Sequence, residues 1–338
     1  MNIFIIGGTG FISSSLVKKL LFNRHRVTLF TRGIRTNHFG TTPNLTLVYG
    51  DRNNETSIRN AFEGKIFDVV VDMIAYLPEQ SESAFNVVNK KMGRFIHCST
   101  ISIYMVSAAV NIPITEDQDH FPIMEYFPRN PFGMDYGLSK RQCEDILWKN
   151  HDIKRFPVTM LRPTFVSGPG DSAKRDFFWI ERILDGQPLL IPGNGEYKFQ
   201  QVFVDDVAEA FSNVIETDKT IGQAYNVAAE EVFTLNEYLS TLSELLNKKP
   251  EFHYINQTKF DSLDISYSDK GDVFPFNTRR DAVFSLEKIK REINYHSTPF
   301  NLWMQKTIDW FVNNYKGHST GYNNRAKEIA LIKQKIMV

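Results

Sequence analysis

The chain has 338 residues, with 39 basic and 39 acidic side chains, so its formal net charge of zero gives no general attraction to nucleic acid or anionic lipid. Its 42% hydrophobic and 23% charged residues are ordinary for a soluble protein of one large domain or two, and no apolar run approaches the roughly 20 residues that cross a bilayer. The only two cysteines, Cys98 and Cys143, exclude a disulfide framework, argue against structural zinc and predict a cytoplasmic location.

The first half of the chain alternates between apolar runs and segments with helical spacing. Residues 2–6 end at once in glycines, which indicates a strand rather than a signal peptide. The next predicted elements, in order, are helix 11–22, strands 27–30 and 45–49, helix 57–62, strand 67–72, helix 81–91 and strand 94–99. Apolar strands that alternate with helices predict an α/β fold, a doubly wound parallel sheet of the Rossmann type.

The second half continues this pattern and changes character near residue 230. Its predicted elements are helix 136–149, strands 158–161 and 202–204, helix 205–215, strand 224–227, helix 234–246 with a Thr234–Glu237 capping box, an irregular segment 256–282, and helices 285–293 and 299–315.

These elements predict three parts of the chain. Residues 1–170 plus 200–230 form a dinucleotide-binding Rossmann domain, and residues 171–199 plus 231–315 form a smaller C-terminal substrate-binding lobe. Residues 316–338 form a basic tail, which we interpret as a solvated terminal helix; an arm that binds nucleic acid is the alternative.

A glycine turn at residues 7–10 follows the first predicted strand. Gly7 permits a tight turn, and Gly10 lets the backbone approach a pyrophosphate at the start of the next helix, whose N-terminal amides attract the phosphates. A plain strand–turn–helix is the alternative. The position of the usual third glycine is Ser13, from which we expect slightly looser packing of the helix on the strand.

The end of the second predicted strand discriminates between NAD and NADP. An NAD site usually has a carboxylate there, whereas this chain has Arg32 and, just beyond, Arg35. A guanidinium group matches the 2′-phosphate, so we predict NADP as the preferred cofactor and NAD as the alternative. Arg32 as an ordinary surface arginine is the competing interpretation. Asp51 would accept from the adenine amino group, or is simply a turn aspartate.

Tyr136 and Lys140 are four residues apart on a predicted helix and therefore share a face. An ammonium group beside the phenol, together with a positively charged nicotinamide, would lower the pKa of Tyr136. Tyr136 would then exchange a proton with a substrate hydroxyl or carbonyl while hydride moves, and Lys140 would bind the nicotinamide ribose. A surface pair without catalytic function is the alternative.

Thr100 ends the fifth predicted strand, at the sheet edge where open α/β folds bind ligands. We expect its hydroxyl to polarise the substrate oxygen, with Ser99 as the fallback; a hydroxyl bonded only to local backbone is the alternative. Other chemistries fit worse, because the chain lacks metal-like histidine spacing, a glycine–serine elbow and a P-loop lysine.

The chain resembles the extended short-chain dehydrogenases/reductases of the NAD-dependent epimerase/dehydratase family from residue 1 to about 245. The segments that carry the resemblance are residues 7–12, 98–100 with Tyr104, 136–140, 161–171 and 203–208. The resemblance implies a catalytic triad of Thr100, Tyr136 and Lys140, with Pro163 to Val166 near the nicotinamide. The full set expected to bind the cofactor is Gly7, Gly10, Phe11, Ile12, Arg32, Arg35, Asp51, Arg52, Ala75, Ser99, Tyr136, Lys140, Pro163, Thr164 and Val166.

The chain also departs from this family. Phe199 falls where many sugar-nucleotide members carry an arginine for the diphosphate, and the interval from Thr100 to Tyr136 is longer than expected. Residues 27–33, 50–52 and 201–205 resemble a subgroup close to the chloroplast stem-loop-binding proteins, some of which lack catalysis or bind RNA.

The expected function is an NAD(P)-dependent oxidoreductase or epimerase that acts on a hydroxyl or ketone of a sugar, sugar nucleotide or secondary metabolite. The alternative is a non-catalytic NAD(P)-binding or RNA-associated scaffold. The expected partner is a small polar substrate, with no membrane and no nucleic acid; family members often form homodimers.

Overall fold

The computed structural model of the chain describes residues 1–34, 39, 42–126, 133–263, 265, 274–276, 279–319 and 321–334. The predicted cofactor residue Arg35 lies outside these residues. Within the described part, no helix combines the length and the apolar character that a membrane crossing requires.

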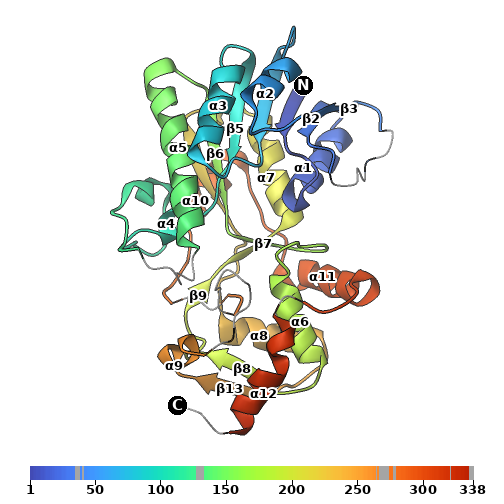
Figure 1. Cartoon of the computed structure of the whole chain (residues 1–338), viewed down its shortest axis with the longest axis vertical. Helices are drawn as coiled ribbons and strands as arrows, with labels where there is room; N and C mark the ends of the chain where they lie inside the picture. Colours follow the sequence, from blue (N-terminus) through green and yellow to red (C-terminus); the bar gives the residue numbers. More distant parts are fainter. Residues whose placement is uncertain are drawn as a thin grey trace.

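A seven-stranded parallel sheet, in the order β11-β6-β5-β4-β1-β2-β3, forms one half of the molecule (Figure 1). Its strands are β1 (Asn2–Ile6), β2 (Arg26–Thr31), β3 (Leu45–Tyr49), β4 (Phe67–Asp72), β5 (Met92–Cys98), β6 (Val158–Pro163) and β11 (Gln223–Val227). The chain runs outward from β1 to β3 and then from β4 in the opposite direction, so the strand order reverses between β1 and β4. The predicted doubly wound sheet is therefore confirmed.

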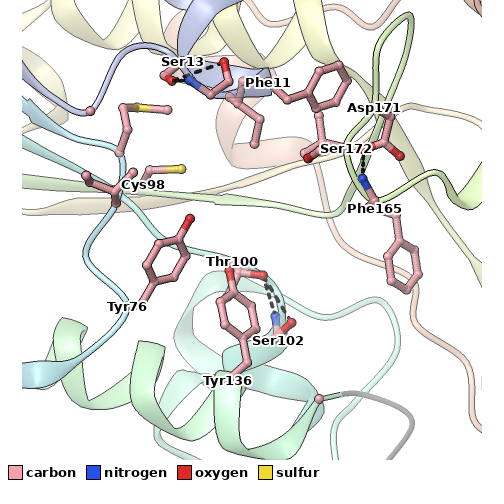
Figure 2. Close-up of a pocket in the computed structure, with 18 of the residues that line it drawn as sticks. Phe11, Ser13, Tyr76, Cys98, Thr100, Ser102, Tyr136, Phe165, Asp171 and Ser172 are labelled. Carbon is pink, nitrogen blue, oxygen red and sulfur yellow. Dashed lines mark hydrogen bonds between the residues drawn. The ribbon is translucent and has the colours of Figure 1, made fainter. Parts of the chain in front are cut away.

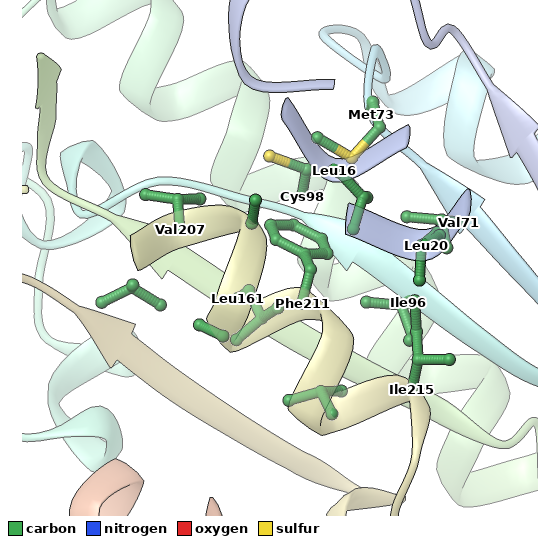
Figure 3. Close-up of a cluster of buried hydrophobic side chains, with 14 of the residues drawn as sticks. Leu16, Leu20, Val71, Met73, Ile96, Cys98, Leu161, Val207, Phe211 and Ile215 are labelled. Atoms are coloured by element: carbon green, nitrogen blue, oxygen red, sulfur yellow. The ribbon is translucent and has the colours of Figure 1, made fainter. Parts of the chain in front are cut away.

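Helices cover both faces of this sheet, because successive residues of a strand point to opposite sides. Ile3 and Ile5 of β1 enter the core beneath α1 and α7, which Figure 3 shows packed against each other, whereas Phe4 and Ile6 enter the core beneath α2, α3 and α5. The covering helices are α1 (Phe11–Phe22), α2 (Glu55–Ala61), α3 (Pro78–Val88), α5 (Met134–Lys154), α7 (Val204–Ile215) and α10 (Glu287–Ile293).

A second core, rich in aromatic side chains, occupies the other half of the molecule (Figure 1). Its larger elements are α6 (Arg175–Leu184), α8 (Leu235–Leu245), α9 (Gln257–Asp261), α11 (Phe300–Asn314) and α12 (Arg325–Lys333). The two-stranded sheets pair β7 (Phe165–Ser167) with β10 (Gln201–Phe203), β9 (Lys198–Phe199) with β12 (Phe233–Thr234), and β8 (Leu189–Pro192) with β13 (Phe252–Ile255). The short helix η3 (Tyr322–Asn324) also belongs to this half. The short helices α4 (Ser102–Met105), η1 (Glu116–His120) and η2 (Asp218–Thr220) lie beside the elements of the sheet half.

Two sequence-based expectations for this half have different outcomes. The capping box is confirmed, since the Glu237 N–H donates to Thr234 Oγ1 at 3.1 Å and the Thr234 N–H donates to Glu237 Oε2 at 2.8 Å. The expectation of a solvated terminal helix is wrong for α12, because Arg325, Glu328 and Ile332 are buried. The buried Glu328 carboxylate is neutralised inside the protein and not by water, because the Arg182 guanidinium group of α6 binds it.

Candidate active site

A cleft of about 1140 Å³ lies between the carboxyl edge of the sheet and the second core. It is lined by the β1–α1 turn, by residues that follow β2 to β6, by the first turn of α5 and by residues 171–175 and 274–276. Small-molecule sites usually have volumes of about 300–1,000 Å³. The cleft is therefore large enough for a cofactor and a second molecule.

The glycine turn has the open backbone that a phosphate site requires. Gly7 and Gly8 have φ angles of +104° and +112°, which side-chain-bearing residues rarely adopt, and a Cβ atom on Gly8 would lie 2.7 Å from a methyl carbon of Leu29. Gly10 begins α1 with an ordinary φ, and its N–H donates to Ser13 Oγ at 2.9 Å. The serine that replaces the third glycine thus occupies one of the amides of the turn.

Apart from Arg35, which lies outside the described residues, the residues expected at the adenosine end line the cleft, but their surroundings differ. Arg32 is exposed, and no described residue bonds its guanidinium group. Asp51 accepts from the Asn53 N–H at 2.9 Å, which is the turn arrangement. Arg52 is buried and donates through Nη1 to both oxygens of Asp72 at 3.1 Å, so it joins the loop after β3 to the end of β4.

Tyr136 lies in the first turn of α5 and lines the cleft with Thr100 (Figure 2). Gly137 lets α5 pack closely against α4, because a Cβ atom at this position would lie 2.6 Å from the Ser102 carbonyl oxygen. The Thr100 Oγ1 accepts from the Ser102 N–H at 3.2 Å, and its side chain lines the cleft together with the Tyr136 phenol. The structure thus brings together the two hydroxyl groups that the sequence analysis assigned to proton transfer and substrate polarisation.

The pKa of Tyr136 is raised and not lowered by the surrounding protein. Although 42% of the residue is exposed to the cleft, burial of the phenol is the largest cause, followed by Cys98 and Tyr76. The Thr100 hydroxyl and the positive charge of Arg175 act in the opposite direction and lower the pKa of Tyr136. The protein groups alone therefore give the opposite direction from the one expected, and Arg175 supplies a cation that the sequence analysis missed.

Lys140 is buried beneath the cleft and does not line it. Its Nζ donates to the Ala75 and Cys98 carbonyl oxygens, at 2.8 and 2.5 Å, and lies 3.2 Å from His97 Nε2. Burial lowers the pKa of both Lys140 and His97. An ammonium group has three N–H donors, and three protein acceptors surround this one. Ala75, expected at the cofactor, thus contacts Lys140 through its carbonyl group.

The remaining expected residues divide between the cleft wall and the interior. Phe11, Ile12, Thr164 and Val166 line the cleft, whereas Ser99 and Pro163 do not. Ser99 Oγ and Thr164 Oγ1 are buried without a described partner. Thr100, rather than the fallback Ser99, is therefore the hydroxyl that faces the cleft.

Three charged residues line the cleft that were not among the expected site residues: Asp135, Asp171 and Arg175. Asp171 Oδ1 accepts from the Ala173 N–H at 2.8 Å, and burial raises the pKa of its carboxyl group to about 6. Arg175 begins α6, and its guanidinium group lies 5.3 Å from the centre of the Phe165 ring. The signal available in the sequence was the glycine–proline turn at residues 168–170, which precedes Asp171 and Arg175.

The comparisons with known proteins agree with this architecture. The family model described as "NAD dependent epimerase/dehydratase family" matches residues 3–228. The chain is 26% identical to the chloroplast stem-loop binding protein of 41 kDa b of Arabidopsis thaliana over 87% of this chain and 74% of that protein. It is 22% identical to a trifunctional UDP-glucose 4,6-dehydratase, epimerase and reductase of the same plant, over 93% of this chain but only 47% of that protein.

Solved structures show the same fold at lower identity. The crystal structure of dTDP-glucose 4,6-dehydratase from Bacillus anthracis in complex with NAD superposes with a TM-score of 0.73 at 20% identity, and covers 93% of this chain and 97% of that one. Because the family model spans more than half of the 338 residues, the chain belongs to the NAD dependent epimerase/dehydratase family of enzymes.

Proposed function

We propose that the chain binds a nicotinamide dinucleotide in the cleft and interconverts a hydroxyl and a ketone on a polar substrate. The observation that carries this proposal is that one cleft is lined both by the glycine turn, with its positive φ angles, and by Tyr136 with Thr100. A sugar nucleotide is the first substrate class to test, because two of the proteins named above are named for their action on UDP-glucose or dTDP-glucose.

In this proposal the protein supplies position and proton transfer. The dinucleotide, when bound, supplies the hydride exchange. The turn at Gly7 and Gly8 and the N-terminus of α1 hold the phosphates. Thr100 donates a hydrogen bond to the substrate oxygen, and Tyr136 gives or takes the proton of that oxygen. Lys140 holds the ends of β4 and β5 together beneath the site through its carbonyl contacts.

We infer a preference for NADP from Arg32, which lines the cleft after β2 without a partner among the described residues. A guanidinium group that binds a 2′-phosphate contributes about 1.5–3 kcal/mol, so Arg32→Ala should weaken NADPH binding about tenfold or more and leave NADH binding nearly unchanged. Fluorescence titration of both cofactors measures this. Tighter binding of NADH than NADPH by the unmodified protein would contradict the preference.

Replacement of Tyr136 by Phe tests the catalytic assignment. The variant should lose at least about a hundredfold in turnover, the lower end of general acid–base contributions, and keep its affinity for the dinucleotide. Because epimerisation and dehydration return the hydride, NMR should follow products from UDP- and dTDP-hexoses, and absorbance should follow net oxidation. The control is Tyr197→Phe, which removes a phenol from outside the cleft. Retained turnover in Tyr136→Phe would refute the assignment.

An RNA-associated scaffold is the second candidate, because one relative is named a stem-loop binding protein. The terminal helix offers little support, since Arg325 is paired with Asp185 and Glu328. RNA binding that weakens steeply with salt, together with no turnover on the full substrate panel, would favour this candidate over the enzyme.

A further inference from the structure

We propose that Arg175 binds an oxyanion of the substrate, a phosphate or carboxylate group, in the cleft beside Tyr136. This inference rests on the proposed function, because it assigns the substrate-binding part of the same cleft. It names the chemistry that the substrate must carry in addition to its reacting hydroxyl or ketone.

Few basic side chains in the described part of the cleft are available to a ligand. Among the described residues, Arg32, Arg52 and Arg175 are the only basic side chains that line the cleft, and no lysine does. Arg52 is committed to Asp72 and to the Gln80 carbonyl oxygen. Arg32 lies after β2, at the end assigned to the adenosine ribose. Of the cations in the described part of the cleft, Arg175 is therefore the one left for the substrate.

The surroundings of the Arg175 guanidinium group favour the binding of an anion. The side chain is half-buried, and its guanidinium group lies 5.3 Å from the centre of the Phe165 ring. No described residue forms a hydrogen bond or ion pair with this guanidinium group, although the carboxyl group of Asp171 is near enough to feel its charge. A guanidinium group supported by an aromatic ring keeps its N–H donors free for two parallel bonds to an oxyanion.

Phe199 stands where many sugar-nucleotide members of the family carry an arginine for the diphosphate. Phe199 is fully buried and does not line the cleft; its ring is stacked on Phe276, with centroids 5.0 Å apart. The Phe165 ring contacts the rings of Phe199 and Phe276, and the Arg175 guanidinium group lies over the same Phe165 ring. The aromatic cluster that replaces an arginine at position 199 thus supports an arginine from α6.

Arg175 and Tyr136 line the same cleft. The positive charge of Arg175 is also one of the influences that lower the pKa of the Tyr136 phenol. An oxyanion held by Arg175 would place the substrate within reach of Tyr136 and Thr100. Asp171 contributes by accepting from the Ala173 N–H, which fixes the turn that leads into Arg175.

The test is binding of two anions to the cofactor-loaded full chain, measured by calorimetry without any requirement for turnover. UDP probes a phosphate source and D-glucuronate probes a carboxylate source. Arg175→Ala should weaken the affinity for the probe that matches the substrate about tenfold or more. Arg175→Lys should lose less affinity because it keeps the positive charge. Lys174→Ala is the matched control: it removes the same charge one residue earlier, where Nζ lies over Tyr315, outside the cleft.

The outcomes separate the two sources and the two proposals. A loss for UDP alone identifies a phosphate-bearing substrate, and a loss for D-glucuronate alone identifies a carboxylate. Failure of both probes to bind the unmodified protein, unchanged affinity in Arg175→Ala, or an equal loss in Lys174→Ala would overturn the inference. Because binding is measured separately from turnover, a Tyr136→Phe variant that stays active would refute the proposed function without affecting this result.

Discussion

Glu328 holds the terminal helix α12 against α6, and its removal should destabilise the second core. The carboxylate is fully buried; Arg182 donates to it through Nη2 at 2.6 Å and Nε at 3.0 Å, and Arg325 donates at 3.1 Å. In Glu328→Ala, Arg325 keeps its bonds to Asp185 at 2.7 and 3.0 Å. Arg182, which is 1% exposed, keeps hydrogen bonds only to the carbonyl oxygens of Gly321 and Phe178, at 3.2 and 3.3 Å.

The cost therefore comes mainly from leaving the Arg182 charge without a carboxylate. Breaking a buried ion pair by removing one partner costs about 3–5 kcal/mol, and we expect that loss in the free energy of unfolding. Urea denaturation followed by tryptophan fluorescence measures it, because Trp179 and Trp303 lie in the second core. Glu244→Ala, which removes an exposed carboxylate from α8, should change the stability by less than about 0.5 kcal/mol.

A double replacement makes the test sharper. Arg182→Met combined with Glu328→Leu removes both charges and should recover most of the loss, because apolar residues of similar volume replace buried ion pairs at little cost. If Glu328→Ala is within about 1 kcal/mol of the unmodified protein, a range typical of exposed ion pairs, the reasoning from burial is refuted.

Two further replacements test the cleft. Gly8→Ala places a Cβ atom 2.7 Å from Leu29 at a φ of +112°, so it should weaken dinucleotide binding in a fluorescence titration; Gly64→Ala, at φ +64° with open space around it, should destabilise the fold by about 1 kcal/mol and leave binding intact. Asp171→Asn should change the pH dependence of stability, because burial raises the pKa of the carboxyl group from 3.8 to about 6. The folded protein binds this proton more tightly than the unfolded chain, so stability falls as the pH rises from about 4 to 6, by about 3 kcal/mol for a shift of this size. Between pH 4.5 and pH 8 the fall in stability measured by denaturation should be about 2 kcal/mol larger in the unmodified protein than in the variant, because part of the total of about 3 kcal/mol is lost below pH 4.5. Equal profiles would show that the Asp171 carboxyl group titrates normally.

The sheet could be predicted from the sequence because its strands, except the edge strand β3, are mostly buried on both faces and are therefore apolar runs. The second core could not be predicted in the same way. Its strands have two to four residues and pair over long distances, as when Leu189 of β8 pairs with Phe252 of β13. Helix α6 was missed as well, because its run Phe177-Phe178-Trp179 gives no helical period; all three side chains are buried between other elements.

The candidate site shows the same division. Thr100 and Tyr136 could be placed from local signals, a strand end and a helix start, and the structure puts both in one cleft. Arg52 lies beside Asp51 in the sequence, but the Asp72 carboxylate that binds it comes from a different strand. Which arginine stays available to a ligand is therefore decided by tertiary contacts, and the sequence alone does not contain that information in any local pattern.

The contrast between Lys140 and Arg175 has a consequence for recognition. Three protein acceptors surround the Lys140 ammonium group, so binding a ligand there would require the loss of a buried hydrogen bond. The Arg175 guanidinium group has an aromatic support and no described acceptor, so an oxyanion adds bonds there without breaking any. Since α6 belongs to the second core, we propose that residues near the sheet carry the chemistry and that the second core selects the molecule on which that chemistry acts.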